Sequence, residues 1–299
     1  MMMQKRIRKI LTISLILSMI LPAILVSYAS AAAEAPQYSV GDRWEYRIKW
    51  LDSGINGTVT REIVDDSVNV PIDTEQYECF QIKEWQFAQW QSGQQISNSS
   101  MDTNLYLLKS GLSEGRNLTV VKYDFQVEYN GVIRQISNIT YSPPNFLKEF
   151  DFPLTVGKNW TAETTETTIL EIPPLPPFPP ETVPFSRNFS VVEERKNVEV
   201  PKGRFDTYVI RYETTDGIYE EYYSPLVGGN VMEIVYDKSW NEEIRIELLN
   251  YKYARAPSAL MDWWVLLAIG VVAVVAIVSV IFLVRRGKRP PTPTPPAPT

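Results

Sequence analysis

The chain has 299 residues, a formal net charge of −6, no histidine and a single cysteine, Cys79. The lack of histidine excludes Ser-His-Asp and Cys-His catalytic systems and histidine-ligated zinc or haem. One cysteine excludes an intrachain disulfide and any metal site that is built from several cysteines.

An export signal is predicted over residues 1–33. Basic residues between positions 5 and 9 precede an apolar stretch from residue 10 to residue 26, and small residues follow it. This order of charge, apolar run and Ala-x-Ala is that of a cleavable signal peptide. Cleavage after Ala31 and cleavage after Ala33 both agree with the pattern. An uncleaved N-terminal anchor is the alternative.

The region from Tyr38 to Tyr253 has the residue alternation of an all-β fold. Apolar side chains alternate with charged ones in residues 43–51 and again in residues 121–129. A period of two indicates strands with one buried side and one side in solvent. We expect type I′ hairpins at Asn130-Gly131 and at Asp216-Gly217, because both central residues of that turn need positive φ.

An internal repeat divides this region into two parts. Val40-Gly41-Asp42-Arg43-Trp44 recurs as Val156-Gly157-Lys158-Asn159-Trp160, and further segments recur in the same order. The sequence therefore predicts two tandem antiparallel β modules, over residues 37–141 and 155–255, with a linker over residues 142–154. Each module would be a curved sheet, a half-barrel or a sandwich. Convergence between similar β meanders is the alternative explanation.

The second module contains a proline-rich stretch over residues 172–184. Proline lacks the N–H group that a sheet ladder requires, so we expect an exposed, semi-rigid loop that stays out of the sheet. The loop acts as a spacer in this interpretation. Docking into an aromatic groove of a partner is the alternative.

Two segments of the second module carry a family resemblance. They are Gly203-Arg204-Phe205-Asp206-Thr207-Tyr208 and, after a hairpin, Tyr222-Tyr223-Ser224-Pro225-Leu226-Val227-Gly228. This pattern resembles poorly characterised, membrane-anchored prokaryotic envelope proteins, archaeal in character, with half-barrel-like antiparallel β modules of the kind found in periplasmic lipoprotein carriers. The resemblance implies fold and location. The first module departs from it at Lys109-Ser110-Gly111-Leu112.

A transmembrane helix is predicted over residues 263–284, which contain no charged residue. As a helix this run would be about 33 Å long, enough to cross a hydrocarbon core of about 30 Å. Two tryptophans begin the run and a basic cluster follows it, so the positive-inside rule places the basic, proline-rich tail over residues 285–299 in the cytoplasm. A buried core helix is the alternative. Everything before the helix would then be extracellular.

Six glycosylation sequons of the form Asn-x-Ser/Thr lie between the predicted signal and the predicted anchor. The chain has only fourteen asparagines, so this number exceeds what chance would supply. Such sites are acceptors only on an exported, accessible surface. The candidate glycosylation sites are Asn56, Asn98, Asn117, Asn138, Asn159 and Asn188.

The charge of the exported part bears on its partners. Its 21 basic residues against 35 acidic ones give a formal charge of −14. Because nucleic-acid binding relies on Lys and Arg contacts to phosphates, we expect no nucleic-acid partner. The expected partners are the membrane, through the single-pass anchor, and an envelope protein or a glycan.

Carboxylates are the only catalytic side chains present in number. The sequence contains four adjacent acidic pairs: Asp65/Asp66, Glu193/Glu194, Glu220/Glu221 and Glu242/Glu243. Neighbours on a strand point to opposite faces, so no such pair forms a glycosidase dyad, and we interpret the pairs as solvated charge. Cys79 lies on a predicted strand and is expected to be a buried, inert thiol. We therefore expect no enzyme, no cofactor and no metal site.

An aromatic segment is the candidate for ligand stacking. Trp85, Phe87 and Trp90 stand among glutamines, a composition suited to stacking on sugar rings. On a strand, Trp85 and Phe87 would share one face and Trp90 the other. An aromatic strand that covers the core is the alternative.

The sequence thus predicts a cell-surface glycoprotein with a single membrane anchor and a non-catalytic structural, adhesive or partner-binding ectodomain. A carrier or binding protein for an apolar or carbohydrate ligand is the alternative, and it requires a ligand-sized cavity. A carbohydrate-active enzyme is a further alternative, and it requires two facing carboxylates in an aromatic groove.

Overall fold

The computed structural model describes residues 32–92 and 95–253. The predicted transmembrane helix (263–284), the tail (285–299) and the signal up to residue 31 lie outside the described residues. Within the described ranges no helix is both long enough and apolar enough to cross a membrane. The chain divides into two compact units, Met1–Ala256 and Pro257–Thr299, and all described residues belong to the first.

The described chain is almost entirely β structure. One short helix, α2 (Lys109–Ser113), interrupts the strands. The strands are β1 (Arg43–Trp50), β2 (Ile55–Ile72), β3 (Glu75–Ser92), β4 (Gln95–Leu108), β5 (Asn117–Tyr129), β6 (Val132–Tyr141), β7 (Leu147–Asp151), β8 (Asn159–Glu171), β9 (Glu181–Val200), β10 (Gly203–Glu213), β11 (Ile218–Ser224), β12 (Gly229–Tyr236) and β13 (Glu242–Lys252). The all-β prediction is confirmed.

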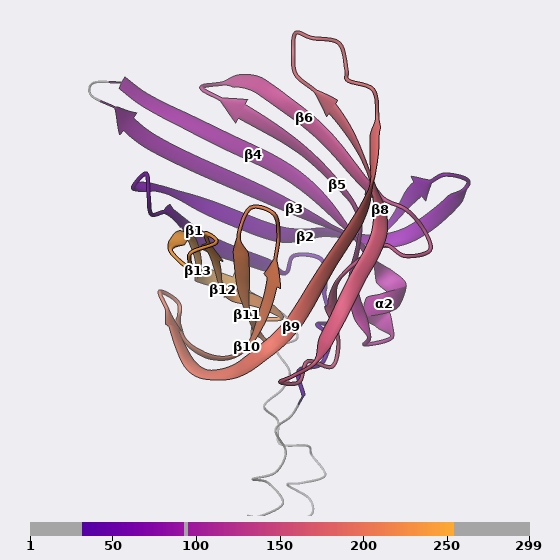
Figure 1. Ribbon diagram of the computed structural model, residues 1–299, viewed down its shortest axis with the longest axis vertical. Helices are drawn as coiled ribbons and strands as arrows, with labels where there is room; N and C mark the ends of the chain where they lie inside the picture. The colour runs from indigo at the N-terminus through magenta and orange to yellow at the C-terminus, as the bar shows by residue number, and fades with distance from the viewer. Residues whose placement is uncertain (1–31, 93–94, 254–299) are drawn as a thin grey trace, which may run out of the picture. The chain divides into compact units, whose positions relative to one another are not determined.

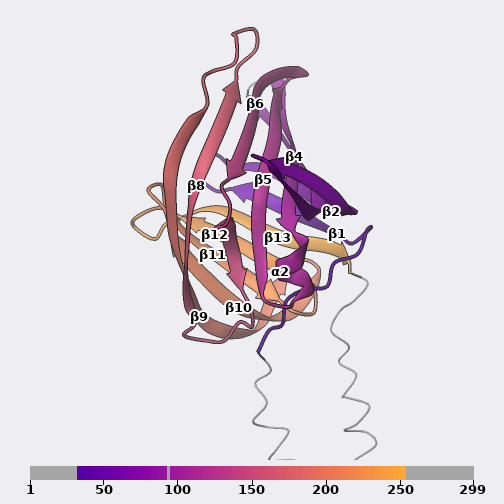
Figure 2. The same ribbon diagram turned by 90° about the vertical axis from the view of Figure 1, so that its right-hand side faces the viewer.

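These strands form one antiparallel sheet that closes into a barrel (Figure 1). The ring runs β4-β3-β2-β1-β13-β12-β11-β10-β9-β8-β6-β5 and returns to β4 through the β4–β5 pairing. It therefore has twelve strands. The remaining strand, β7, pairs with the start of β5, while β6 pairs with the rest of β5. Figure 2 shows β5, β6 and β8 side by side in this part of the wall.

The closed barrel corrects the prediction of two separate modules. Strands β1–β6 come from the first predicted module and β8–β13 from the second, and each set supplies half of one wall. The halves join where β1 pairs with β13 and where β6 pairs with β8. Pairing at both junctions leaves no free sheet edge between the modules, which removes the hazard that unpaired edge strands present.

The alternation in the sequence explains which side of each strand faces inward. In β1, Trp44, Tyr46 and Ile48 are buried, while the charged residues between them are partly or fully exposed. The apolar inner faces of the strands pack into a single core. Trp44 also donates a hydrogen bond from its indole N–H to the carbonyl oxygen of Val227, at 2.9 Å. This bond connects β1 to the turn between β11 and β12.

The two halves begin with the same local geometry. Gly41 and Gly157 have φ of 86° and 85°, a region that favours glycine. Gly41 donates its N–H to the carbonyl oxygen of Ile63, and Gly157 donates to that of Val191, both at 2.8 Å. This agreement is what a duplicated sequence would produce, and the duplication itself stays a prediction.

One of the two predicted type I′ turns is present. Asn130 and Gly131 have φ of 48° and 77°, as that turn requires. Asp216-Gly217 is not such a turn, because neither residue has positive φ. A longer loop joins β10 to β11 there, and the N–H of Thr214 bonds to the carbonyl oxygen of Gly217.

The proline-rich stretch is a loop over only part of its predicted range. Residues 172–180 are outside any strand, but residues 181–184 belong to β9. Pro184 pairs with Thr165 of β8 beyond the last paired residues of β10, so its missing N–H breaks no ladder on that side. The predicted linker over 142–154 likewise contains a strand, β7, which forms part of the wall.

The barrel begins before the predicted start of the first module. Ala33 is buried and exchanges two backbone hydrogen bonds with Leu154. The N–H of Gln37 bonds to the hydroxyl of Tyr253, so the two ends of the described chain lie together. Of the two cleavage sites that the sequence allows, only the one after Ala31 keeps Ala33 in the mature chain.

We predict that Trp44→Phe lowers the free energy of unfolding by about 1–3 kcal/mol, because it leaves the buried carbonyl of Val227 without a donor. Denaturant unfolding followed by circular dichroism measures the change. Trp240→Phe is the control, since Trp240 is half exposed and its substitution should change stability by less than about 0.5 kcal/mol. Equal effects of the two substitutions would contradict the role given to the Trp44 hydrogen bond.

Candidate functional site

The barrel encloses a cavity of about 300 Å³. Its lining comes from β1, β2, β3, β4, β5 and β7 on one side and from β10, β11 and β12 on the other. The charged and amide side chains that line it are Arg61, Glu84, Glu149, Glu221, Asn230 and Glu233, and its larger aromatic residues include Tyr46, Tyr123, Tyr212 and Tyr223. The cavity therefore belongs to neither half alone.

Arg61 of β2 joins the two halves inside the cavity. Its Nε lies 2.5 Å from an oxygen of Glu84 on β3, and its Nη1 lies 2.8 Å from an oxygen of Glu233 on β12. The guanidinium also lies over the ring of Tyr46, 5.2 Å from its centre. Burial alone would lower the pKa of Arg61, but Glu233 and Glu84 raise it well above its ordinary value. Arg61 is thus a permanent cation with two carboxylate partners.

Asn230 connects two carboxylates of neighbouring strands. Its Nδ2 donates to Glu221 of β11 and to Glu233 of β12, both at 3.1 Å. Burial, followed by the charge of Glu233, raises the pKa of Glu221. Burial also acts to raise the pKa of Glu233, but Arg61 outweighs it, so the pKa of Glu233 is lowered. Because the environment separates the two pKa values, Glu221 retains a proton under conditions in which Glu233 is ionised.

Glu149 of β7 is the fourth carboxylate of the cavity. It accepts a hydrogen bond of 2.8 Å from the hydroxyl of Tyr123. Burial raises the pKa of Glu149, and the hydrogen bond from Tyr123 opposes this shift only in part. Neither Glu149 nor Glu221 forms an ion pair with any residue that the structure describes.

None of these cavity residues was predicted as a site from the sequence, although the alternation contains a signal for them. Arg61 stands between Val59 and Ile63, which are buried on the inner face of β2. Glu233 stands in the same way between Val231 and the inward position 235 of β12. A charged residue at a position where the alternation requires an apolar one is expected to be buried and partnered.

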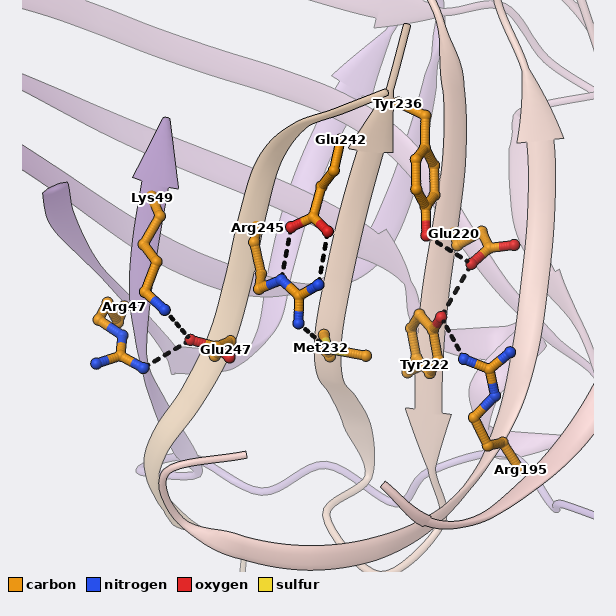
Figure 3. Close-up of polar contacts among 10 residues, drawn as sticks. All are labelled: Arg47, Lys49, Arg195, Glu220, Tyr222, Met232, Tyr236, Glu242, Arg245 and Glu247. Carbon is orange, nitrogen blue, oxygen red and sulfur yellow. Dashed lines mark hydrogen bonds and ion pairs between the residues drawn. The ribbon is translucent and has the colours of Figure 1, made fainter. Parts of the chain in front are cut away.

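The pair Glu220/Glu221 corrects our interpretation of the acidic pairs as solvated charge. Glu221 faces the cavity, and Glu220 is only 5 % exposed on the outer side of β11. Glu220 accepts hydrogen bonds from the hydroxyls of Tyr222 and Tyr236 (Figure 3). It also pairs with Arg211. The adjacent residues do point to opposite faces, as predicted, but the outer face is itself covered at this place.

The cover is the bent hairpin of β9 and β10. Arg195 of β9 donates to the hydroxyl of Tyr222, two strands away in the sheet, at 2.9 Å. Figure 3 shows this contact continuing the line of polar contacts on the outer side of the wall, where Arg47 and Lys49 pair with Glu247. Every charged group drawn there has a partner, so we assign the network to the stability of the wall.

The six predicted glycosylation sites all lie on the outer face. Each asparagine follows or precedes an inward-facing residue of its strand, as Asn138 follows the buried Ser137 and Asn188 precedes the buried Phe189. Asn56, Asn159 and Asn188 are exposed, and Asn98, Asn117 and Asn138 are partly buried. Occupancy of these sites stays a prediction.

The candidate stacking residues do not come together. Phe87 is 46 % exposed on the outer face of β3, and Trp85 on the same face lies under the ammonium group of Lys83. Trp90 lies on the other face and contacts the ring of Tyr129. None of the three lines the 300 Å³ cavity. Their role in ligand binding is therefore not supported by a common site.

Two further sequence expectations concern metal and thiol chemistry. Among the described residues, no group of three or more acidic or cysteine side chains is placed to hold a metal ion. Cys79 is fully buried, and burial raises the pKa of its thiol to about 12. The thiol is therefore protonated at neutral pH and unreactive, as predicted.

Comparisons with known proteins give only distant likenesses. No protein-family model and no curated protein matches the chain. A "putative exported protein with YmcC-like fold" from Bacteroides fragilis NCTC 9343 is 12 % identical, with a TM-score of 0.33 over 74 % of this chain and 100 % of that one. A "putative lipoprotein" from Parabacteroides distasonis ATCC 8503 is 14 % identical, with a TM-score of 0.31 over 73 % and 97 % of the chains. Neither assigns a function to this chain.

We predict that Glu221→Gln stabilises the barrel at alkaline pH. The pKa of Glu221 is raised from 4.5 to about 8, so the wild-type protein is most stable when this carboxyl is protonated and loses that stability as the pH rises through about 8. The amide has no charge to bury. The variant should therefore match the wild type near pH 4.5 and exceed its unfolding free energy by more than about 1 kcal/mol at pH 9.

Thermal or denaturant unfolding from pH 4.5 to pH 9 measures this difference. Glu163→Gln serves as the control, because Glu163 is exposed on β8. A difference between Glu221→Gln and the wild type that does not grow with pH would contradict the burial assigned to this carboxyl.

Proposed function

We propose that this protein is a membrane-anchored, glycosylated cell-surface protein that binds a small ligand inside its barrel without transforming it. The observation that carries the proposal is the cavity of about 300 Å³, lined by tyrosines and by partly buried charged groups from both halves of the wall. A volume of this size lies at the lower end of the range of small-molecule sites.

The composition of the cavity argues against a purely structural interior. A barrel that serves only as a scaffold is filled by apolar side chains, which pack at high density and need no polar partners. Here four glutamates and one arginine line the interior instead. Removing such groups from water is unfavourable, so their presence is explained by a ligand that they recognise.

The polarity of the cavity also selects between the ligand classes that the sequence left open. An apolar ligand would bury Glu149 and Glu221 without adding to the hydrogen bond that each accepts from Tyr123 or Asn230, which is unfavourable for both groups. A polar ligand can supply hydrogen bonds to them. The proposal therefore replaces the apolar carrier by a binding protein for a polar molecule.

The proposed location rests on the sequence and on the outer face of the barrel. An export signal and a membrane anchor are predicted at the ends of the chain, and all six sequons lie on the face that would meet solvent and the glycosylation machinery. The partners in this proposal are the membrane and a glycan or protein of the envelope, with no nucleic acid.

A partner-binding role of the outer wall is the second candidate. Ile96 and Val132 lie near the tips of the β3–β4 and β5–β6 hairpins and are 61 % and 49 % exposed. Exposed apolar side chains at one place can mark a contact with another protein. This role is compatible with a ligand in the interior, because it uses the other face of the wall.

We predict that native mass spectrometry of the full-length protein, released from a non-ionic detergent, finds a small molecule that denaturation removes. Leu105→Trp, which fills the cavity, should abolish this extra mass, because Leu105 lines the cavity wall. Leu226→Trp is the matched control, since Leu226 is 43 % exposed in the turn between β11 and β12, and it should keep the extra mass.

Circular dichroism establishes that both variants are folded. If the polypeptide and its covalent glycans account for the whole mass of the wild-type protein, a ligand-binding function is contradicted. Retention of the small molecule by folded Leu105→Trp would contradict the cavity as its site.

A further inference from the structure

The cavity offers a ligand two carboxyl groups without an ion-pair partner and no unpaired cation among its lining residues. Its only lining cation, Arg61, is already paired with Glu84 and Glu233. Glu149 and Glu221 have no ion-pair partner within the described residues. Their hydrogen bonds come from neutral groups, the hydroxyl of Tyr123 and the amide of Asn230.

A further cation that influences Glu149, Arg187, is engaged elsewhere. The guanidinium of Arg187 lies over the ring of Tyr212, 4.7 Å from its centre, and over the rings of Phe185 and Phe189. It lowers the pKa of Glu149 only as a minor, longer-range influence, after burial and the hydrogen bond from Tyr123. The two carboxyl groups therefore lack a cation in direct contact.

One polar atom of the cavity lining lacks a hydrogen-bond partner, which is independent evidence for a missing polar group. The Oδ1 atom of Asn230 is buried and accepts no hydrogen bond. A second unpartnered atom, the hydroxyl of Thr103, lies on the inner face of β4 opposite Glu84 but outside the lining. A buried polar atom without a partner is destabilising by about 1–3 kcal/mol, so such atoms are rare unless something else satisfies them.

The walls next to these groups are aromatic. Tyr46, Tyr123 and Tyr212 line the cavity together with Trp44. The faces of such rings attract cations, and the attraction is larger in a site from which water is excluded. Arg61 over Tyr46 shows that the cavity already uses this contact for its own cation.

We propose that the ligand of the barrel is a small organic cation with N–H donors, an ammonium or an amidinium or guanidinium group, held against Glu149 and Glu221. This inference deepens the ligand-binding function proposed above and rests on it. Such a group supplies the positive charge that the two carboxylates lack and donors for their oxygens, and the tyrosine rings surround it. A neutral sugar could donate hydrogen bonds but would not pair with the ionised form of either carboxyl group.

Binding in this mode is coupled to a proton. Glu221 is faced by Glu149 from β7, by Glu233 from β12, by Arg61 from β2 and by Tyr212 from β10. Burial and the two carboxylates raise the pKa of Glu221, so in the empty protein it carries a proton at neutral pH. A bound cation stabilises the ionised form, so the proton leaves as the cation enters. Affinity for the cation therefore rises with pH.

Benzamidine and benzamide are the probes that test this inference. The two molecules have nearly the same shape, but only benzamidine is cationic between pH 6 and pH 9. We expect titration calorimetry of the full-length protein, in non-ionic detergent, to show binding of benzamidine at least tenfold tighter than that of benzamide. We also expect its affinity to increase at least tenfold from pH 6 to pH 9, with release of a proton at pH 7.

Charge-neutral variants assign the site. Glu221→Gln and Glu149→Gln should each weaken benzamidine binding at pH 9 by tenfold or more. Glu163→Gln removes the same charge from the outer face of β8 and should leave the affinity unchanged. Because Glu221→Gln is expected to be at least as stable as the wild type, its loss of binding cannot come from unfolding.

The outcomes separate the inference from the function on which it rests. If benzamide and benzamidine bind equally well and Leu105→Trp abolishes both, the cationic ligand class is overturned. The cavity then still stands as a binding site. Benzamidine binding that Leu105→Trp and both Glu variants leave intact would overturn the cavity as the cation site. Failure of benzamidine to bind at any pH overturns the inference, and a small molecule found by native mass spectrometry would then still support the binding function.

Discussion

Pairing between β1 and β13 closes the sheet, and most properties of the molecule depend on that closure. In a closed wall each side chain points either into the barrel or away from it, because neighbours on a strand alternate. The wall shields the inner positions from bulk water, and Arg61 and Glu233 keep only 28 % and 19 % of their side-chain surface accessible. A charged residue at an inner position, such as Arg61, must therefore find its partner across the barrel, and it does so in Glu233, far away in the sequence.

The closure also explains why neither half suffices alone. Arg61 and Glu84 come from the first half, whereas Glu221, Asn230 and Glu233 come from the second. An open half-barrel would expose these groups to water, where ion pairs and hydrogen bonds contribute little. Enclosure lowers the local dielectric, and electrostatic interactions between the cavity side chains become stronger as a result. The pKa of Glu221 therefore rises, while that of Glu233 falls.

The inner and outer faces of the wall serve different purposes. The outer face carries the six sequons, and its ion pairs near β9–β13 are internally satisfied. The inner face carries two carboxyl groups, those of Glu149 and Glu221, without an ion-pair partner among the described residues. Carboxyl groups removed from bulk water without a cation are unfavourable, so their presence is consistent with recognition, and the proposed cationic ligand would supply their partner.

The sequence by itself determined the strands, the inner and outer sides of β1, the Asn130-Gly131 turn and the buried thiol of Cys79, because these follow from local alternation and turn chemistry. It did not reveal that the two predicted modules form one barrel, that β7 lies in the predicted linker, or that Glu149, Glu221 and Arg61 share a cavity. Those features depend on pairing between strands far apart in the chain. Local periodicity shows which face a residue takes, and only the tertiary structure decides what that face meets.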